Sequence, residues 1–227
     1  MNDQRHSKAD EPSLVLDEET RAVREAENAI RQIDMVMSVI DGIECDERPF
    51  RLRVSMILTL HRIALEGLSR YAGNWRPSAV SIGQSKHSPP PAQLVPSLME
   101  EMCDWVEAHW EESSAVALSA YVMWRLNWIH PFDDGNGRTS RAVSYLVLCA
   151  KTKARLPGRV TIPEIIARNR TPYYGALEQI DESCSGDAFD LAPMVKLLED
   201  CLAQQLMSVW NAATSAQTED VSGPKFH

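Results

Sequence analysis

Apolar residues recur at intervals of three and four over most of this chain, and that spacing limits its fold more than any other feature. In the segment 18–40 they occupy positions 22, 26, 29, 30, 33, 36, 37 and 40. Such positions share one face of an α-helix. The same spacing predicts helices over 51–69, 92–111, 113–128, 138–151 and 188–210. The pattern therefore predicts an all-α fold, a bundle of helices.

A different pattern occurs between residues 70 and 91. The stretch "SAVSIGQSKHSPPP" is polar, ends in three prolines and alternates enough to predict a small β-hairpin or an extended loop. Two later segments, "TIPEIIARN" and "TPYYGALEQID", predict short helices that begin near Pro163 and Pro172, because proline suits the first helical turn.

Composition excludes several classes of protein. The chain has 227 residues, is 44% hydrophobic and has no apolar run near the length of a membrane span. One domain over 14–212 is expected, without a membrane segment, between flexible polar tails at 1–13 and 213–227. The polar N-terminus also lacks the apolar segment of a signal peptide, so a cytoplasmic location is expected.

Charge and cysteine content narrow the possibilities further. The net charge is −9 and no cluster of Lys and Arg offsets it, which disfavours nucleic acid as a partner. The five cysteines are scattered without a CxxC pair. They are expected to be reduced and structural, because small thiols within apolar helical patterns are usually buried.

The stretch "HPFDDGNGRTSR" (130–141) interrupts the helical pattern and combines residue types that structure alone rarely requires. Pro131 prevents smooth continuation of the preceding helix, and Gly135 and Gly137 permit tight backbone close to a ligand. Helical spacing resumes at Arg138. A loop that enters a helix N-terminus offers unpaired N–H groups and a partial positive charge, which together favour a bound phosphate.

Four side chains in this stretch carry chemistry. Arg138 and Arg141 share a helix face, and two cations at a helix N-terminus indicate an anion between them and the helix dipole. Asp134 offers an oxygen ligand for Mg²⁺, which usually binds one or two carboxylates together with substrate phosphates. Histidine is the side chain whose unperturbed pKa lies near neutrality, so His130 suits a general base. The set predicts phosphoryl or nucleotidyl transfer.

Each of these signals has an ordinary structural explanation when it is taken alone. His-Pro occurs in loops, Asp-Gly-Asn-Gly is common in turns, and Arg-x-x-Arg is usually a solvated helix face. It is their order within a single short stretch that favours a functional site.

The stretch resembles the signature of the Fic/Doc family, H-x-F-x-D/E-G-N-G-R-x-x-R. Every specified position is filled, by His130, Phe132, Asp134, Gly135, Asn136, Gly137, Arg138 and Arg141. The likeness extends to "RYAGNWRPSAVSIG" and "PPPAQLVPSLMEEMCDWV" and covers roughly 15–212. It implies a Fic-type helical bundle of the protein adenylyltransferase branch. Such an enzyme binds ATP with Mg²⁺ and transfers AMP to a Ser, Thr or Tyr hydroxyl of a target protein.

The resemblance also implies a role for each residue of the signature. His130 is expected to be the general base, and Asp134 the Mg²⁺ ligand. Phe132 is expected to point inward and anchor the loop.

Five further residues of the signature are expected to bind the nucleotide. The backbone of Gly135, Asn136 and Gly137 would hold the α- and β-phosphates, with the Asn136 side chain adding a contact. Arg138 and Arg141 would orient the β- and γ-phosphates. Together these groups form the phosphate site that the resemblance predicts.

Gly137 bears on the type of reaction, because the branch that resembles phosphate-transferring toxins has lysine at this position. Glycine favours the nucleotide orientation in which the α-phosphate is attacked. Two alternatives stay open: transfer of another phosphate-containing group (phosphate, UMP or phosphocholine), and a catalytically silent interaction module. The sequence does not identify adenine as the base. Tyr173 and Tyr174 fall in a region that borders the base in related proteins, but a tyrosine pair on an amphipathic helix also suits the core.

The segment 75–91 corresponds to the flap of the family, a short β-hairpin whose edge binds an extended target segment by strand addition. Ile82 and His87 are the flap residues expected to contact the target protein. The alternative is an exposed connection bounded by prolines.

Related proteins often carry an inhibitory helix with the pattern S/T-x-x-x-E-G/N. Here "VREAEN" places Glu27 and Asn28 in register, although Val23 stands where Ser or Thr is expected. The resemblance therefore implies autoinhibition through a pair between Glu27 and Arg141, since a buried arginine gains from an acidic partner when ATP is absent. Whether the chain forms a homodimer stays open.

Overall fold

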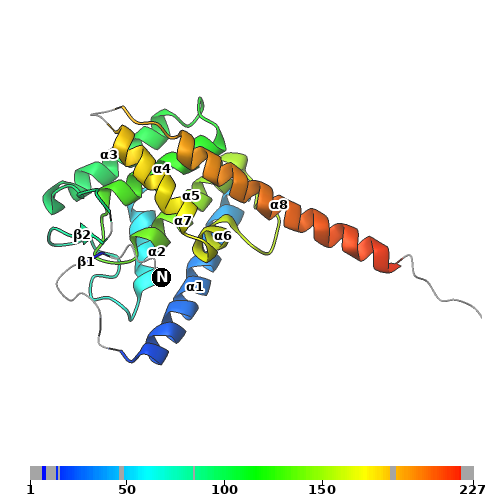
Figure 1. Cartoon of the computed structure of the whole chain (residues 1–227), viewed down its shortest axis with the longest axis horizontal. Coiled ribbons are helices and arrows are strands. Elements are labelled where there is room, and N and C mark those ends of the chain that lie inside the picture. Colours follow the sequence, from blue (N-terminus) through cyan, green and yellow to red (C-terminus); the bar gives the residue numbers. More distant parts are fainter. Residues whose placement is uncertain are drawn as a thin grey trace, which may run out of the picture.

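A computed structural model describes residues 7–8, 14, 16–45, 49–83, 85–184 and 188–220. Within these residues the chain forms eight α-helices, one 3₁₀ turn and two very short strands (Figure 1). The helices are α1 (Glu18–Cys45), α2 (Val54–Leu65), α3 (Val95–Ala108), α4 (Ala115–Ile129), α5 (Asn136–Thr152), α6 (Ile162–Arg168), α7 (Thr171–Ser183) and α8 (Ala192–Asp220). The 3₁₀ turn is η1 (Ala92–Leu94), and the strands are β1 (Ser7–Lys8) and β2 (Ser81–Ile82). The all-α prediction is confirmed.

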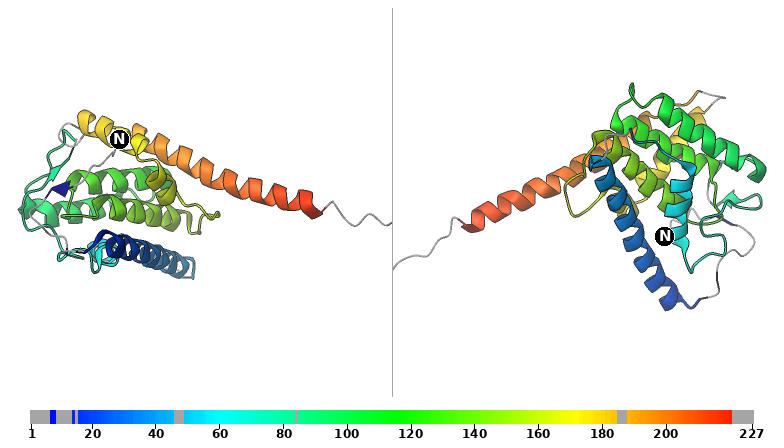
Figure 2. Two further views of the ribbon diagram at one scale, coloured as in Figure 1. Left: turned by 60° about the horizontal axis from the view of Figure 1, so that its bottom comes forward. Right: turned by 180° about the vertical axis from the view of Figure 1, so that it is seen from behind.

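The bundle is built around α5. Every side chain from Thr139 to Ala150 is buried, so this helix is enclosed on all sides. Its main neighbour is α4; α1 and α2 pack against α5 on one side, and α7 and α8 pack against α4 on the other. Figure 2 shows these as three layers, with α4 and α5 in the middle. The two central helices approach closely because Ser119 and Ser144 each donate a hydrogen bond to the backbone carbonyl of the other, at 2.9 and 3.0 Å.

Two buried amide side chains fix the rotation of α1 against α2. The Asn28 amide donates to the carbonyls of Ala64 and Glu66, and the Gln32 amide donates to the carbonyl of Leu60. The inward face of α1 continues through Val36 and Ile40, which are 3% and 0% exposed.

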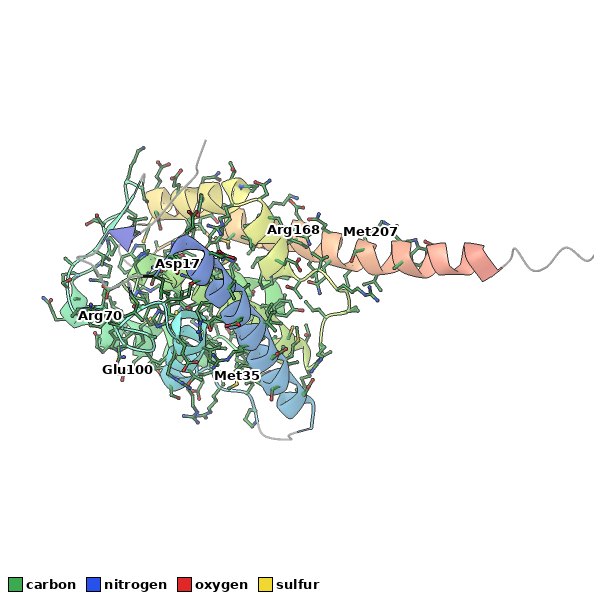
Figure 3. The ribbon with its side chains drawn as sticks, turned by 90° about the horizontal axis from the view of Figure 1, so that it is seen from below. Asp17, Met35, Arg70, Glu100, Arg168 and Met207 are labelled. Atoms are coloured by element: carbon green, nitrogen blue, oxygen red, sulfur yellow. The ribbon has the colours of Figure 1, made fainter. Side chains whose placement is uncertain are left out.

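The apolar residues of α1 do not all lie on this inward face, contrary to the prediction. Ile30 and Ile33 are 62% and 45% exposed, because the phase set by Asn28 and Gln32 turns them outward. In Figure 3 α1 lies across the near face of the bundle, with Asp17 just before its first turn and Met35 in its second half. A second apolar stripe therefore faces solvent on this helix.

The flap differs from the prediction in its strand pairing. Strand β2 pairs with β1 in antiparallel register, with Ser7 opposite Ile82, and no hairpin forms within the described part of 75–91. An unpaired strand edge exposes backbone donors and acceptors, and here the N-terminal segment satisfies them. The predicted N-terminal tail, 1–13, contributes a strand at 7–8, and its other residues lie outside the described part. Leu14, the first residue of the expected domain, donates its N–H to the Leu68 carbonyl.

Helix α8 is longer than predicted and projects beyond the bundle (Figures 1 and 2). It continues to Asp220, so residues 213–220 of the predicted C-terminal tail are helical, and 221–227 lie outside the described residues. Met207, on the projecting part (Figure 3), is 55% exposed. Among the described helices, none combines the length and apolar character that crossing a bilayer requires.

Replacing a central leucine should destabilise the bundle. Leu146 on α5 is 0% exposed, and Leu146→Ala should lower the free energy of unfolding by about 2–5 kcal/mol, because it removes buried methyl groups and leaves a cavity. Leu206→Ala on α8 is the matched control: that side chain is 43% exposed, and its loss should change stability by less than about 1 kcal/mol. Urea unfolding measures both. Similar losses in the two variants would contradict the central place of α5.

Candidate active site

The signature stretch is a tight turn between α4 and α5. His130 caps the end of α4 in a left-handed conformation, with φ 51° and ψ 58°. Gly135 precedes the first residue of α5 and is also left-handed, with φ 78°. A left-handed conformation is costly for a residue with a side chain, so His130 must be held by its surroundings.

The loop is closed by Asn136 and anchored by Phe132. The Asn136 side chain accepts a hydrogen bond from the Phe132 N–H at 3.0 Å and donates one to the Phe132 carbonyl at 2.7 Å. Phe132 is fully buried and stacks on His61, with 3.6 Å between ring centroids. The expected inward anchor is confirmed. The Asn136 side chain is thus hydrogen-bonded within the loop itself, and its contact with phosphate stays a prediction.

His61 on α2 supports the same loop. Its Nδ1 accepts a hydrogen bond from the Gly73 N–H at 3.0 Å, so its Nε2 carries the proton and donates to the Asp134 carbonyl, also at 3.0 Å. Burial lowers the pKa of His61 from 6.5 to about 4, against the opposing effects of the Asp134 carbonyl and carboxylate. The imidazole is therefore neutral at pH 7, as the bond from Gly73 requires.

The two glycines of the signature serve different purposes. A Cβ on Gly135 would lie 2.3 Å from Leu65 Cδ2, so the loop approaches α2 too closely for any side chain at this position. A Cβ on Gly137 would lie 3.2 Å from an Arg141 Nη1, on the side of the ligand cavity. Gly137 thus leaves the first turn of α5 open toward Arg141.

A cavity of about 200 Å³ lies in front of this turn. The predicted residues that line it are His130, Asp134, Gly135, Asn136, Gly137, Arg138 and Arg141 from the signature, with Ile82 and His87 from the flap. The structure therefore brings the signature and the flap together at one cavity.

Arg141 is the most unusual charge in the cavity. It is 8% exposed, and burial lowers its pKa. Among the described residues no carboxylate pairs with it, and its charged neighbours Arg138 and Arg170 are also cationic. A buried cation needs compensating negative charge, so this arrangement favours an anionic ligand.

Arg138 is already engaged by two acids. It lies 3.0 Å from the Asp134 carboxylate and 3.6 Å from the carboxylate of Glu25 on α1. Asp134 also accepts a hydrogen bond from the Gly135 N–H at 2.5 Å. Asp134 and Arg138 thus form a pair in the lining of the cavity, and Glu25 connects α1 to this pair.

The imidazole of His130 is oriented by the end of α4. Its Nδ1 lies 3.4 Å from the Asn127 carbonyl. A carbonyl only accepts hydrogen bonds, so the proton of a neutral ring that makes this contact is on Nδ1. Nε2 then carries the lone pair, which is the arrangement that a general base requires.

Glu27 does not lie where the sequence pattern predicts. Its side chain is 58% exposed and pairs with Arg24 at 3.7 Å, and among the described residues no contact joins it to Arg141. The reason is the phase of α1: Asn28 and Gln32 face α2, which turns Glu27 outward and places Glu25 at the cavity. Glu25, rather than Glu27, is the acid that α1 brings to the site.

Besides Glu25, the cavity contains further polar residues that the sequence did not single out. They include Asn127, Arg170 and Asp181, which come from α4, the segment before α7 and α7 itself. Their positions carry no distinctive local pattern and depend on how the helices meet. Tyr173 and Tyr174 also line the cavity. Tyr173 is 1% exposed and its hydroxyl lies 3.2 Å from the Ser140 hydroxyl, while Tyr174 is half-buried.

The residues of the site fit Mg²⁺ only in company with a substrate. Within the described residues there is no cluster of three or more His, Cys, Asp or Glu side chains that could hold a metal ion. Asp134 is a single carboxylate, 46% exposed, beside the open turn of α5. One carboxylate with phosphate oxygens and water is a common environment for Mg²⁺, so Asp134 suits that role.

Comparison with known sequences finds a matching family model and several similar proteins. The family model described as Fic/DOC family matches residues 51–148, which include the whole signature. The protein adenylyltransferase Fic of Drosophila willistoni is 30% identical over 181 residues, which is 79% of this chain and 33% of that protein. The corresponding protein of Culex quinquefasciatus is 30% identical over 200 residues, which is 86% of this chain and 36% of that protein. The central part of the chain therefore matches the Fic/DOC family. The chain spans about a third of the length of these relatives.

Solved structures agree with the Fic fold. A Fic domain containing signaling protein from Bacteroides thetaiotaomicron superimposes with a TM-score of 0.67 at 23% identity, over 83% of this chain and 71% of that one. Fic-1 from C. elegans gives a TM-score of 0.68 at 20% identity, over 89% and 55%. BepC from Bartonella tribocorum, solved with bound AMPPNP, gives 0.54 at 13% identity, over 82% and 88%. At these identities the likeness establishes the fold of this Fic domain.

The buried His61 should make the Fic domain less stable in mild acid. Its pKa is about 4 in the folded protein, below the ordinary value of 6.5, so the unfolded chain binds the proton more readily. The contribution of the neutral His61 imidazole to the free energy of unfolding is fully present above pH 6.5. As the pH falls toward 4, this contribution is lost, which lowers the free energy of unfolding by up to about 3 kcal/mol. Urea unfolding between pH 7.5 and 4.5 measures it. In His61→Gln the side chain does not titrate, so the free energy of unfolding should depend less on pH. An unchanged pH dependence in a folded variant would refute the assignment of this effect to His61.

Proposed function

We propose that this Fic domain transfers AMP from ATP to a Ser, Thr or Tyr hydroxyl of a target protein. The observation that carries the proposal is Arg141: a buried cation without an acidic partner among the described residues faces a cavity that also contains His130. The curated relatives named protein adenylyltransferase Fic support this reaction, as does the AMPPNP in the BepC structure.

The donor phosphates would bind over the first turn of α5. The N–H groups that begin this helix lack helical partners, and the helix dipole adds positive charge at the same end. Gly137 keeps the approach open, while Arg138 and Arg141 stand on the same side. When Mg²⁺ is bound at Asp134 it would neutralise part of the phosphate charge. The phosphates would also displace Asp134 as the main partner of Arg138.

His130 would act on the acceptor. Its Nε2 takes the proton from the target hydroxyl as the hydroxyl oxygen attacks the α-phosphorus. The bond from the α-phosphorus to the bridging oxygen breaks, and pyrophosphate leaves with that oxygen. The product is an AMP ester of the hydroxyl, and the proton stays on His130 until solvent takes it up. Arg138 and Arg141 stabilise the negative charge that develops on the leaving group.

The flap would hold the target segment beside this base. Ile82 and His87 line the cavity, and His87 is kept in place by a 2.7 Å hydrogen bond to the Trp128 carbonyl. A target strand that took the edge of β2 now paired with β1 would displace the N-terminal segment. Target binding and the position of residues 7–8 are therefore linked in this proposal.

We further propose that α1 restrains the enzyme through Glu25. The Glu25 carboxylate lies 3.6 Å from Arg138, one of the two arginines assigned to phosphate binding. As long as that pair persists, Arg138 has an acidic partner and the phosphates must compete with it. The partial exposure of the Glu25–Arg138 pair limits how strongly Glu25 restrains nucleotide binding, because exposed ion pairs contribute up to about 1 kcal/mol.

The reaction and its donor can be tested together by intact mass. Incubated with ATP and Mg²⁺, the parent protein should gain one AMP for each modified site, on itself or on a supplied target. His130→Ala should reduce the rate at least about 100-fold and leave ATP affinity nearly unchanged, because the base contacts the acceptor. Parallel incubations with UTP and with a phosphocholine donor test the alternatives. Mass gains of UMP, phosphocholine or phosphate, or none with any donor, would overturn the proposal.

Two neighbouring acids on α1 provide a matched pair for the restraint. Glu25→Gln should raise self-modification by up to about fivefold and tighten nucleotide binding to a similar extent, because it frees Arg138. Glu27→Gln should change neither, since Glu27 is exposed and pairs with Arg24. Titration calorimetry and intact mass measure the two effects. An increase with Glu27→Gln alone would show that the sequence pattern, and not the contact with Arg138, identifies the restraining acid.

A further inference from the structure

Arg76 is a buried cation outside the signature, in the extended segment between α2 and β2. It is 2% exposed. Its Nε donates to the His130 carbonyl at 2.8 Å, its Nη1 to the Ser78 carbonyl at 2.9 Å, and its Nη2 to the Pro90 carbonyl. Its backbone N–H donates to the Pro131 carbonyl at 2.9 Å. One residue therefore holds four backbone carbonyls from two parts of the chain.

Two of these carbonyls mark the ends of the flap. Ser78 precedes β2, and Pro90 follows His87 just before η1. Because both ends bind the same guanidinium, the segment between them is a closed loop whose base has a fixed width. The part of this loop that lines the cavity, at Ile82 and His87, is carried on that base.

The other two carbonyls begin the signature loop. His130 is the left-handed residue at the end of α4, where helix carbonyls lack partners within the helix. Arg76 supplies donors to His130 and to Pro131, the next residue. These bonds help to hold His130 in a conformation that is costly for a residue with a side chain.

Asp133 balances the charge of Arg76. It is 3% exposed, and neither of its carboxylate oxygens has a hydrogen-bond partner among the described atoms. The attraction between Asp133 and Arg76 opposes the effect of burial on the pKa of each group. A buried acid of this kind is costly unless a cation is near, so the two residues depend on each other.

We propose that Arg76 is a positioning residue that couples the flap to His130. One guanidinium fixes the base of the acceptor-binding loop and the backbone of the general base, so the acceptor hydroxyl and the imidazole keep a constant separation. This inference rests on the proposed transfer reaction for its kinetic consequences. The coupling itself is a property of the folded chain.

The coupling predicts an asymmetry between the two substrates. Arg76 contacts the flap and the end of α4, and it does not line the cavity in which the donor phosphates are placed. Weakening Arg76 should therefore misalign the acceptor with the base and leave nucleotide binding as it is. A misplacement of about 1 Å between reacting groups can cost about 100-fold in rate.

Arg76→Lys is the informative substitution, with Arg70→Lys as its control. Lysine keeps the charge beside Asp133, but its single ammonium group cannot reproduce the planar fork that reaches three carbonyls in different directions. Arg70 is exposed, lies at the edge of the molecule in Figure 3 and makes no such contacts among the described residues. The comparison separates loss of the fork from a general effect of replacing arginine.

Three measurements test the coupling. Arg76→Lys should lower the rate of AMP transfer about 10- to 100-fold, leave the Kd for ATP within twofold of the parent, and speed amide hydrogen exchange in both the flap and the signature loop. The amides of His87 and Phe132 report these two segments, since each makes a hydrogen bond to a side chain. Arg70→Lys should match the parent. Transfer within twofold of the parent, or an equal loss of ATP affinity, would overturn the proposal.

Hydrogen exchange also separates this inference from the proposed function. If the parent transfers no AMP, the proposed reaction fails, but the flap and loop amides of Arg76→Lys must still exchange faster together for the coupling to stand. If Arg76→Lys does not fold, amide hydrogen exchange of the parent protein at low denaturant concentration tests the coupling instead. His87 and Phe132 should then open with the same free energy, and independent opening would overturn the coupling.

Discussion

The site depends on the closure of the loop between α4 and α5 by the side chain of Asn136. Its two hydrogen bonds to Phe132 make the loop tight enough for α5 to begin directly beside the end of α4. Phe132 then fills the space against His61, and Gly135 passes α2 with no room for a Cβ. These contacts fix the end of α4 and the start of α5 relative to each other. The first turn of α5 and the imidazole of His130 therefore line the same cavity.

The sequence predicted the parts of this arrangement that depend on local pattern. The helices follow from apolar spacing, and the signature follows from the order of its residues, so His130, Gly137 and Arg141 could be named before their positions were known. Contacts between distant segments could not be predicted in this way. The dependence of His130 on Arg76 joins residues 54 positions apart, and no local pattern marks it.

Two side chains, Glu27 and Asn136, show that a motif specifies residue types but not the phase of a helix or the partner of a side chain. Glu27 fits the inhibitory pattern, yet the amides of Asn28 and Gln32 rotate α1 so that Glu25 faces Arg138. The Asn136 side chain has the right chemistry to bind phosphate, and it is hydrogen-bonded to the nearest backbone groups. In both cases hydrogen bonds to main chain set where the side chain lies.

The attachment of α1 has a consequence for how the domain can change state. The first half of this helix is joined to the end of α2 through polar contacts, the amide of Asn28 and the Arg31–Glu66 ion pair, whereas the deeply buried Val36 and Ile40 lie in its second half. Exchanging a few polar contacts for water costs far less than exposing aliphatic side chains. Parting the end of α1 that carries Glu25 from the bundle therefore costs less than parting the end that carries Val36 and Ile40.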